Sequence, residues 1–194
     1  MLLAEKYKNH KIVLASKSPR RQELMKGLDI SFEVRTMEVD ESFPPALQRE
    51  EIPLFLSKLK AQAFLPEMKE NEVVITADTV VWVNDHVLNK PEDRDEAIAM
   101  VNELSGNHHV VYTGVTITTK DKALSFYDET KVYFEALTQE EIEYYIDKYQ
   151  PYDKAGSYGV QEFIGYMGIS KLEGSYFNVM GLPVHQVYKK LMEF

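Results

Sequence analysis

The sequence predicts a mixed α/β fold of the α+β kind, and three features carry this prediction. Three long β-rich runs cover residues 73–83, 109–119 and 122–134. Helical segments with capping residues lie before, between and after them. Of the 194 residues, 44% are hydrophobic and 27% are charged, which is sufficient for a buried core. Because no linker, repeat or change of composition interrupts the chain, we expect a single domain over residues 1–194.

The first elements are a strand, a turn and a helix. Residues 11–15 form a short apolar run that is typical of a buried strand. A helix is predicted over residues 19–27, because Ser18 suits its N-cap, Pro19 its first position and Gly27 its end. The turn before this helix presents free backbone N–H groups, which favour an anion.

Alternation, turn residues and caps predict the remaining elements. Residues 30–35 alternate like a second strand, and a loop over residues 37–49 contains two adjacent prolines. A turn at residues 84–85 leads from the run 73–83 into a short strand at 86–88. The Gly-rich part between residues 150 and 182 is predicted as strand and turn. Further helices are predicted over residues 51–64, 93–104, 138–149 and 183–194.

Charge and composition exclude several classes of partner. The formal net charge is −9, whereas proteins that bind duplex nucleic acid usually carry a basic face, so we expect no nucleic-acid partner. No apolar run reaches 18 residues, and the beginning of the chain does not resemble a signal peptide. The chain has no cysteine, which excludes disulfides and thiolate metal sites. We therefore expect a cytoplasmic protein without a membrane partner.

Several common catalytic classes lack their signatures. The sequence contains no GxxxxGK[ST], GxGxxG, GxSxG or HExxH motif. Of the five histidines only His108 and His109 are neighbours, and adjacent strand residues point to opposite faces. A histidine metal site is therefore not expected.

Asp78 is the most informative residue, because it interrupts an apolar β-rich run. An unpaired buried carboxylate is costly. One interpretation places Asp78 at a strand bulge or against backbone donors. The functional interpretation places the carboxylate on the floor of a cleft, where it binds a metal ion or takes a proton from water, with the Thr79 hydroxyl beside it.

An acidic cluster of Glu38, Asp40 and Glu41 lies on the predicted loop. Such a run is ordinarily a solvated loop. However, Mg²⁺ binds proteins through one or two carboxylates together with substrate phosphates. Paired with Asp78, one of these acids completes such a site.

The candidate phosphate-binding cations are Lys17, Arg20, Arg21, Lys60 and Lys90. Arg20 and Arg21 lie in the first turn of a helix, where the helix dipole disfavours cations, and a bound anion offsets this conflict. Lys60 and Lys90 are also explained by an ordinary surface position and a turn. In the Gly-rich C-terminal third, the amide of Gln161 offers both a donor and an acceptor to a pyrimidine edge.

Taken together, these segments resemble the Maf family of nucleotide pyrophosphatases, which cleave at the α-phosphorus. The matching segments occur in family order and span residues 11 to 194. They are Ser16-Lys-Ser-Pro-Arg-Arg21, Ala77-Asp-Thr79, Lys90-Pro91, Leu104-Ser-Gly106, Tyr112-Thr-Gly114, Lys154-Ala-Gly-Ser-Tyr-Gly-Val-Gln161 and Gly181-Leu-Pro183. The combination is similar to the dTTP/UTP pyrophosphatase subgroup. One departure is Phe55, where family members often carry arginine.

The resemblance implies a fold and a set of roles. The fold is an elongated, two-lobed, inosine-triphosphatase-like structure with a central cleft, and family members often form homodimers. Asp78 resembles the general base and Glu41 the acid beside it, and together they hold Mg²⁺ or Mn²⁺. The other implied catalytic residues are Lys60 and Lys90, which face the triphosphate. The implied substrate-binding residues are Ser16, Arg20, Arg21, Thr79 and Gln161.

Two rival functions remain open at this point. One is a catalytically idle nucleotide-binding regulator of cell division, although it would be expected to lack the acidic pair. The other is a pyrophosphatase that prefers modified or purine nucleotides.

Overall fold

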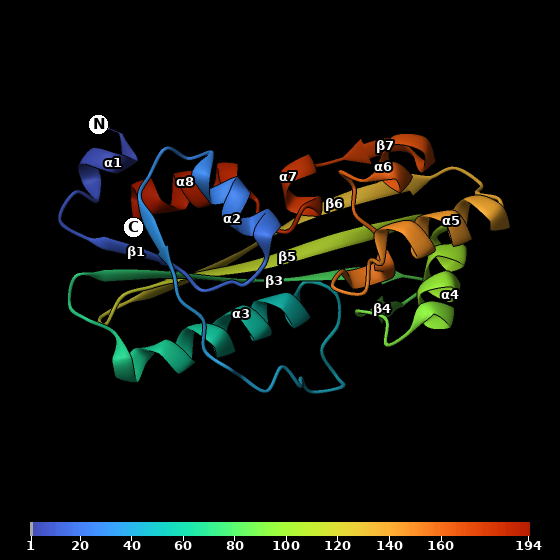
Figure 1. The fold of residues 1–194 in the computed structure, drawn as a ribbon. Coiled ribbons are helices and arrows are strands. Elements are labelled where there is room, and N and C mark those ends of the chain that lie inside the picture. Colours follow the sequence, from blue (N-terminus) through green and yellow to red (C-terminus); the bar gives the residue numbers. More distant parts are fainter. Residues whose placement is uncertain (1) are drawn as a thin grey trace. The chain divides into compact units, whose positions relative to one another are not determined.

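The computed structural model describes residues 2–194, which form a mixed seven-stranded sheet flanked by helices (Figure 1). Six strands follow the order β2-β1-β3-β5-β6-β7, and β4 pairs with β3. The strands are β1 (Lys11–Leu14), β2 (Phe32–Val34), β3 (Glu72–Val83), β4 (His86–Leu88), β5 (His108–Thr118), β6 (Ala123–Phe134) and β7 (Ile169–Glu173). The longer helices are α2 (Pro19–Lys26), α3 (Glu51–Phe64), α4 (Arg94–Leu104), α5 (Gln139–Tyr149) and α8 (Val184–Glu193). The shorter ones are α1 (Leu3–Lys6), η1 (Leu65–Glu67), η2 (Ala155–Ser157), α6 (Phe163–Gly168) and α7 (Tyr176–Val179).

The described chain divides into two compact units. Strands β3, β5 and β6 each contribute residues to both. The first unit contains residues up to 78 together with 113–128 and 181–194. The second contains residues 79–112 and 129–180.

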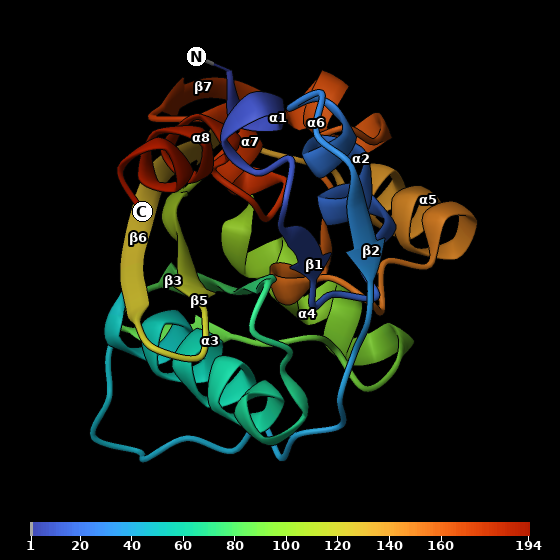
Figure 2. The ribbon, with the colours of Figure 1, turned by 90° about the vertical axis from the view of Figure 1, so that its left-hand side faces the viewer.

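The first unit is built around β1, in which residues 12–14 are buried because helices lie on both faces of the sheet here. β1 pairs in parallel with β2 and with β3, with Val13 opposite Glu33 and Val74. α3 covers one face, and α2 and α8 cover the opposite face (Figures 1 and 2). Burial on both faces explains why β1 is continuously apolar rather than alternating.

The second unit encloses an apolar core of its own. Val81, Leu104, Val132 and Ile146 are all at most 2% exposed and belong to this core. The helices α4 and α5 pack against one another, and β6 pairs with β7 in antiparallel orientation. The β3–β4 hairpin turns at Asn84 and Asp85, which both have positive φ, as tight two-residue hairpin turns require.

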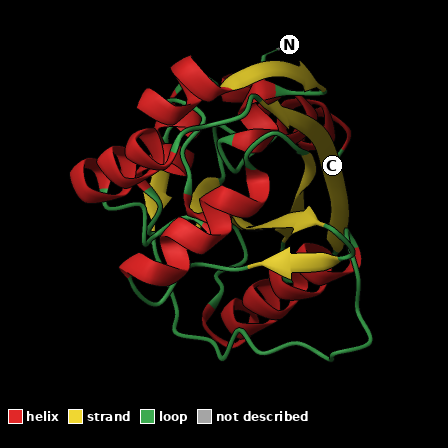
Figure 3. Cartoon of the chain, turned by 90° about the vertical axis from the view of Figure 1, so that its right-hand side faces the viewer, coloured by secondary structure: helices red, strands yellow, loops and turns green. Residues whose placement is uncertain are grey.

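The mixed α+β class predicted from the sequence is confirmed, and the two compact units agree with the two lobes that the resemblance implied. The helix over residues 51–64 and the hairpin at 84–85 are also confirmed. The predicted loop over residues 37–49 contains no helix or strand and forms a long coil in Figure 3. Ser18 caps α2 by accepting a hydrogen bond from the Arg21 backbone N–H at 3.4 Å.

One prediction about the fold was wrong in part. The Gly-rich region between residues 150 and 182 contains η2, α6 and α7 as well as β7. These helices are 3, 6 and 4 residues long, which is too short for a helical periodicity to be visible in the sequence. A single domain over residues 1–194 stays a prediction. Within residues 2–194, no helix is both long and apolar enough to cross a bilayer.

Candidate functional site

Asp78 lies on β3 at the end of the first unit, and its carboxylate is paired with a cation. The residue is only 9% exposed. One carboxylate oxygen accepts a hydrogen bond from Lys60 Nζ at 2.7 Å. This ion pair explains how an acid is tolerated within an apolar strand, since a buried charge requires a partner. The contact with Lys60 was part of neither interpretation of Asp78, and the catalytic role of this carboxylate stays a prediction.

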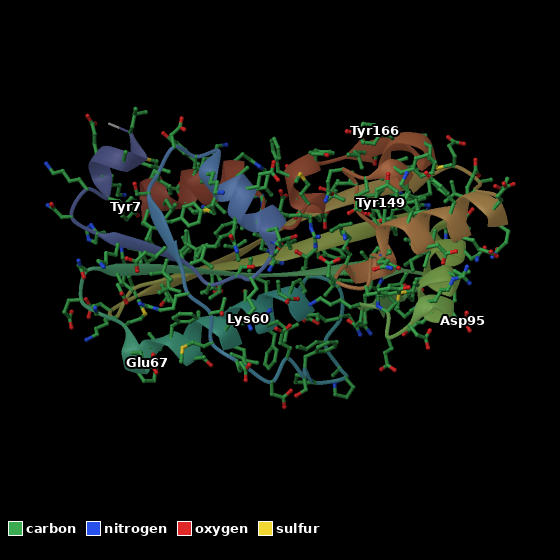
Figure 4. The ribbon with its side chains drawn as sticks, viewed as in Figure 1. Tyr7, Lys60, Glu67, Asp95, Tyr149 and Tyr166 are labelled. Carbon is green, nitrogen blue, oxygen red and sulfur yellow. The ribbon has the colours of Figure 1, made fainter. Side chains whose placement is uncertain are left out.

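Lys60 also joins Asp78 to Glu41. Lys60 projects from α3, where Figure 4 labels it, and its Nζ lies 3.2 Å from a carboxylate oxygen of Glu41. The Glu41 side chain is 52% exposed, whereas those of Lys60 and Asp78 are 14% and 12% exposed. The loop therefore brings one acid of its cluster to the buried pair. The other two acids, Glu38 and Asp40, are exposed, and Asp40 caps the backbone N–H of Ser42.

Arg21 is the cation that α2 contributes to the same unit. Its Nη1 donates to the carbonyl of Ala77 at 2.9 Å, and its Nε donates to the carbonyl of Gly181 at 2.7 Å. Burial lowers the pKa of the Arg21 guanidinium, while the negative charges of Asp78 and Glu41 act in the opposite direction. Arg21 thus fixes the backbone next to Asp78 and adds positive charge beside the two acids.

The turn before α2 supplies the other predicted phosphate-binding groups. Ser16 is 6% exposed, and its hydroxyl accepts a hydrogen bond from the Ser18 backbone N–H at 3.2 Å. Arg20 is partly buried, and its charge contributes to the lowered pKa of Arg21. Two guanidinium groups and a helix N-terminus in one place form a strongly electropositive site, which suits a polyphosphate. Lys17, in contrast, is exposed.

The second unit carries Thr79, Lys90 and Gln161. Thr79 is partly buried, and Lys90 is exposed immediately before the buried Pro91. The backbone N–H of Gly156 donates to the carbonyl of Asn89 at 3.1 Å, so the loop of Lys90 adjoins the segment that leads to Gln161. The Gln161 side-chain oxygen is buried and has no hydrogen-bond partner among the described residues. An acceptor of this kind is suited to a ligand donor. The arrangement of these three residues around Asp78 stays a prediction.

A polar network in the second unit was not found from the sequence. Lys154 is only 8% exposed and forms ion pairs with Asp153 at 2.7 Å and Glu162 at 3.2 Å. Glu162 also accepts a hydrogen bond from the Tyr145 hydroxyl, which in turn accepts one from the Gly159 backbone N–H. The network holds both ends of the segment that contains Gln161. The sequence feature that indicates this network is Lys154, which lies among glycines and apolar residues and is followed by Glu162.

The residues present fit a divalent cation that is held partly by substrate. Two carboxylates, those of Asp78 and Glu41, contact the same ammonium group. The contacting oxygens of Asp78 and Glu41 lie 2.7 and 3.2 Å from Lys60 Nζ, so the distance between these two oxygens does not exceed the sum of the two values. Across residues 2–194 there is no cluster of three or more histidine, cysteine or acidic residues arranged for a metal ion. Two carboxylates are donors of the kind that Mg²⁺ accepts together with phosphate oxygens, and binding of Mg²⁺ or Mn²⁺ here stays a prediction.

Comparison with known proteins identifies the family of the chain. The family model for Maf-like proteins matches residues 11–194. The chain belongs to the Maf family. A Maf relative from Parabacteroides distasonis named dTTP/UTP pyrophosphatase is 53% identical over 99% of this chain and 100% of its own length. A relative from Christiangramia forsetii with the same name is 50% identical over 99% of this chain and 98% of its own.

The resemblance that the ordered motifs suggested is therefore confirmed at the level of the Maf family. Among solved structures, one titled as the Staphylococcus aureus Ham1 protein aligns with 64% of this chain and 71% of its own. Its TM-score is 0.45 and its sequence identity is 17%.

Proposed function

We propose that this Maf-family chain is a nucleoside triphosphate pyrophosphatase that hydrolyses dTTP and UTP to the monophosphate and pyrophosphate. The observation that carries the proposal is the contact of Lys60 with both Asp78 and Glu41, next to the backbone that Arg21 fixes. Relatives at 50% and 53% identity bear the name dTTP/UTP pyrophosphatase, which supports the choice of substrate. The cytoplasm stays the predicted place of action, and a homodimer stays a predicted assembly.

The reaction is attack of a water oxygen on the α-phosphorus. A bond forms between this oxygen and the α-phosphorus, the bond from the α-phosphorus to the bridging oxygen of the β-phosphate breaks, and pyrophosphate leaves. Asp78 orients the water and accepts its proton, as a positioned carboxylate base does. Lys60, which contacts Asp78, and Arg21, which binds the carbonyl of the preceding residue, offset the charge of the triphosphate and of the leaving pyrophosphate. Arg20 and the turn at Ser16 also help to offset the negative charge of the triphosphate.

A divalent cation supplies Lewis-acid stabilisation of the phosphate charge when it is bound. Glu41 and Asp78 are the residues that hold it, together with oxygens of the substrate. Lys60 already neutralises part of the charge of both carboxylates. This partial neutralisation favours a cation that is recruited together with the nucleotide, rather than one held permanently by the protein.

Recognition of the base is assigned to Gln161, with Thr79 and Lys90 as further contacts in the second unit. The buried, unpartnered oxygen of Gln161 supports this role, because an unmet acceptor favours a ligand that donates a hydrogen bond. The N3–H of thymine and of uracil is such a donor. A site built on this contact discriminates against bases that lack a donor in the matching position.

The decisive experiment incubates the pure protein with a panel of pyrimidine, modified-pyrimidine and purine triphosphates and Mg²⁺. Pyrophosphate and orthophosphate are then quantified separately. We expect pyrophosphate as the product, with UTP and dTTP turned over faster than ATP and GTP. Release of orthophosphate would contradict cleavage at the α-phosphorus. Binding of nucleotides without turnover would favour a nucleotide-binding regulator, and fastest turnover of another nucleotide would reassign the substrate.

A further inference from the structure

A buried group of hydroxyls links α3 to the sheet in the first unit. Thr76 Oγ1 donates to the Ser57 carbonyl at 2.7 Å. The Ser57 hydroxyl lies 3.0 Å from Thr116 Oγ1, which lies 2.9 Å from the hydroxyl of Ser125 on β6. Ser57, Thr76 and Thr116 are at most 1% exposed. We call these three residues the hydroxyl cluster.

Residues of the hydroxyl cluster lie on the same face of α3 as Lys60 and on the same face of β3 as Asp78. Thr76 and Asp78 are two residues apart on β3, and alternate strand residues point to the same face. Ser57 and Lys60 are three residues apart on α3, so they are neighbours on one face of that helix. Helical side chains lean toward the helix N-terminus, so Lys60 leans back toward the turn that carries Ser57. The same helix face therefore makes two polar contacts with the same strand face.

A glycine fixes the approach of α3 at its N-terminal end. A Cβ added to Gly114 on β5 would lie 2.4 Å from the backbone carbonyl group of Pro53. The backbones of α3 and β5 therefore lie in direct contact there, with no space for a side chain. Two residues along β5 from Gly114, Thr116 contacts Ser57, which lies one helical turn beyond Pro53. α3 and β5 thus contact each other at two successive places, Pro53 with Gly114 and Ser57 with Thr116, and both precede Lys60 along the helix.

We propose that the hydroxyl cluster is a positioning device for the Lys60–Asp78 pair, with Thr76 as its principal positioning residue. The inference rests on the proposed function, since it concerns the residues assigned to that reaction. Apolar packing alone allows a helix to slide or rotate on a sheet, because dispersion contacts are not directional. Hydrogen bonds are directional, and a broken one inside a core leaves a costly unpaired group. The cluster therefore locks the register that places the Lys60 ammonium on Asp78.

The test compares variants that remove a hydroxyl with one that retains it. In Thr76→Val the hydroxyl is replaced by a methyl group, whereas Thr76→Ser keeps it. The matched control is Thr118→Val, because Thr118 is buried on β5 but its hydroxyl bonds only to carbonyls of the adjacent turn. The kinetic constants kcat and KM are measured with UTP and Mg²⁺, and melting temperatures are recorded for every variant.

We expect Thr76→Val to lower kcat by roughly 10- to 100-fold, since small displacements of catalytic groups have effects of this size. KM should change little, because Arg20 and Arg21 on α2 still bind the phosphates. Thr76→Ser should restore most of kcat, and Thr118→Val should retain the wild-type kcat even if its melting temperature falls equally. Wild-type kcat in folded Thr76→Val would overturn the inference, as would equal losses in Thr76→Val and Thr118→Val.

A second variant keeps the test decisive if Thr76→Val does not fold. Ser57→Ala removes the hydroxyl contact with Thr116 and retains the carbonyl that Thr76 binds. It should also lower kcat without raising KM, and an unchanged kcat would overturn the inference. Failure of the proposed function is recognised separately, because the wild-type protein itself would then release no pyrophosphate.

Discussion

The Lys60 ammonium lies 2.7 Å from a carboxylate oxygen of Asp78, and this contact joins the C-terminal half of α3 to the middle of β3. β3 carries a second buried acid, Glu72, which accepts two hydrogen bonds from the Arg35 guanidinium at 3.0 and 2.7 Å. Glu72 is 1% exposed and Asp78 is 9% exposed, and the cation that pairs with Asp78 also contacts a second carboxylate, that of Glu41. One strand thus offers both a candidate catalytic acid and a structural counterpart.

Asp78→Asn should remove turnover without unfolding the protein. An amide does not accept a proton from water, and losing a required base typically lowers the rate by about 10²–10⁴-fold. The matched control is Glu72→Gln, which neutralises the other buried acid of the same strand. Release of pyrophosphate from UTP is measured for both, with circular dichroism to verify folding. Near-normal turnover by Asp78→Asn, or an equal loss in Glu72→Gln, would refute the assignment of the base.

Glu41→Gln should weaken the binding of the divalent cation. The substitution removes one of the two carboxylate donors that contact Lys60, so more metal should be required for half-maximal activity. Direct Mn²⁺ binding in the presence of a non-hydrolysable UTP analogue provides a second measurement. Glu38→Gln is the control, because it removes an exposed acid from the same loop. Identical Mn²⁺ affinities in the two variants would argue against a ligand role for Glu41.

Arg21→Lys should impair the site although it retains the charge. Arginine uses two differently directed N–H groups to hold the carbonyls of Ala77 and Gly181, and one ammonium group does not reproduce this geometry. We expect a lower kcat/KM for UTP together with a lower melting temperature. The Arg20→Lys variant provides the comparison within the same helical turn. If Arg21→Lys had the kcat/KM and the melting temperature of the wild-type protein, the two backbone contacts would contribute neither to activity nor to stability.

Gln161→Ala should reduce selectivity for pyrimidines. Losing one hydrogen bond to the base corresponds to about 1 kcal/mol, or roughly fivefold in kcat/KM for UTP. Turnover of ATP should fall less, so the ratio of the two kcat/KM values is the quantity to measure. Gln139→Ala, at the exposed start of α5, serves as the control. An unchanged ratio in Gln161→Ala would exclude the proposed role in base recognition.

Glu72 should make folding stability depend on pH in the acid range. Hydrogen bonds from Arg35 are the main cause that lowers the pKa of Glu72 to about 2 from its ordinary value of 4.5. A depressed carboxyl pKa stabilises the fold above pH 4.5, and this stabilisation is lost as the pH falls toward 2. It is on the order of 2 kcal/mol, after allowance for the partly exposed Arg35.

Urea unfolding of the wild-type protein and of Glu72→Gln at a series of pH values measures this term. The difference in the free energy of unfolding should be constant from pH 7 to about pH 5 and should then shrink as the pH is lowered. A difference that stays the same at all pH values would show that Glu72 is not held ionised by Arg35.

The sequence predicted local structure well and spatial relationships only in part. The helix over residues 51–64 and the cap at Ser18 follow from short-range rules, which depend on neighbouring residues. Lys60, however, was indistinguishable from a surface lysine, because its partners Asp78 and Glu41 are 18 and 19 residues away along the chain. The Lys154 network was missed for the same reason. Only the resemblance to the Maf family connected these distant residues before the structure did.

The first unit draws its residues from the beginning, the middle and the last stretch of the chain, and this has a consequence for biosynthesis. Arg21 needs the carbonyl of Gly181, and the hydroxyl of Tyr7 donates to the carbonyl of Leu191 at 2.7 Å. These contacts form only after residues 181–194 have left the ribosome. Residues 79–112 and 129–180 are synthesised earlier, so the second unit is complete first. The nascent protein should therefore complete its candidate catalytic centre after the second unit, because Arg21 gains the contact with Gly181 only once that residue has been synthesised.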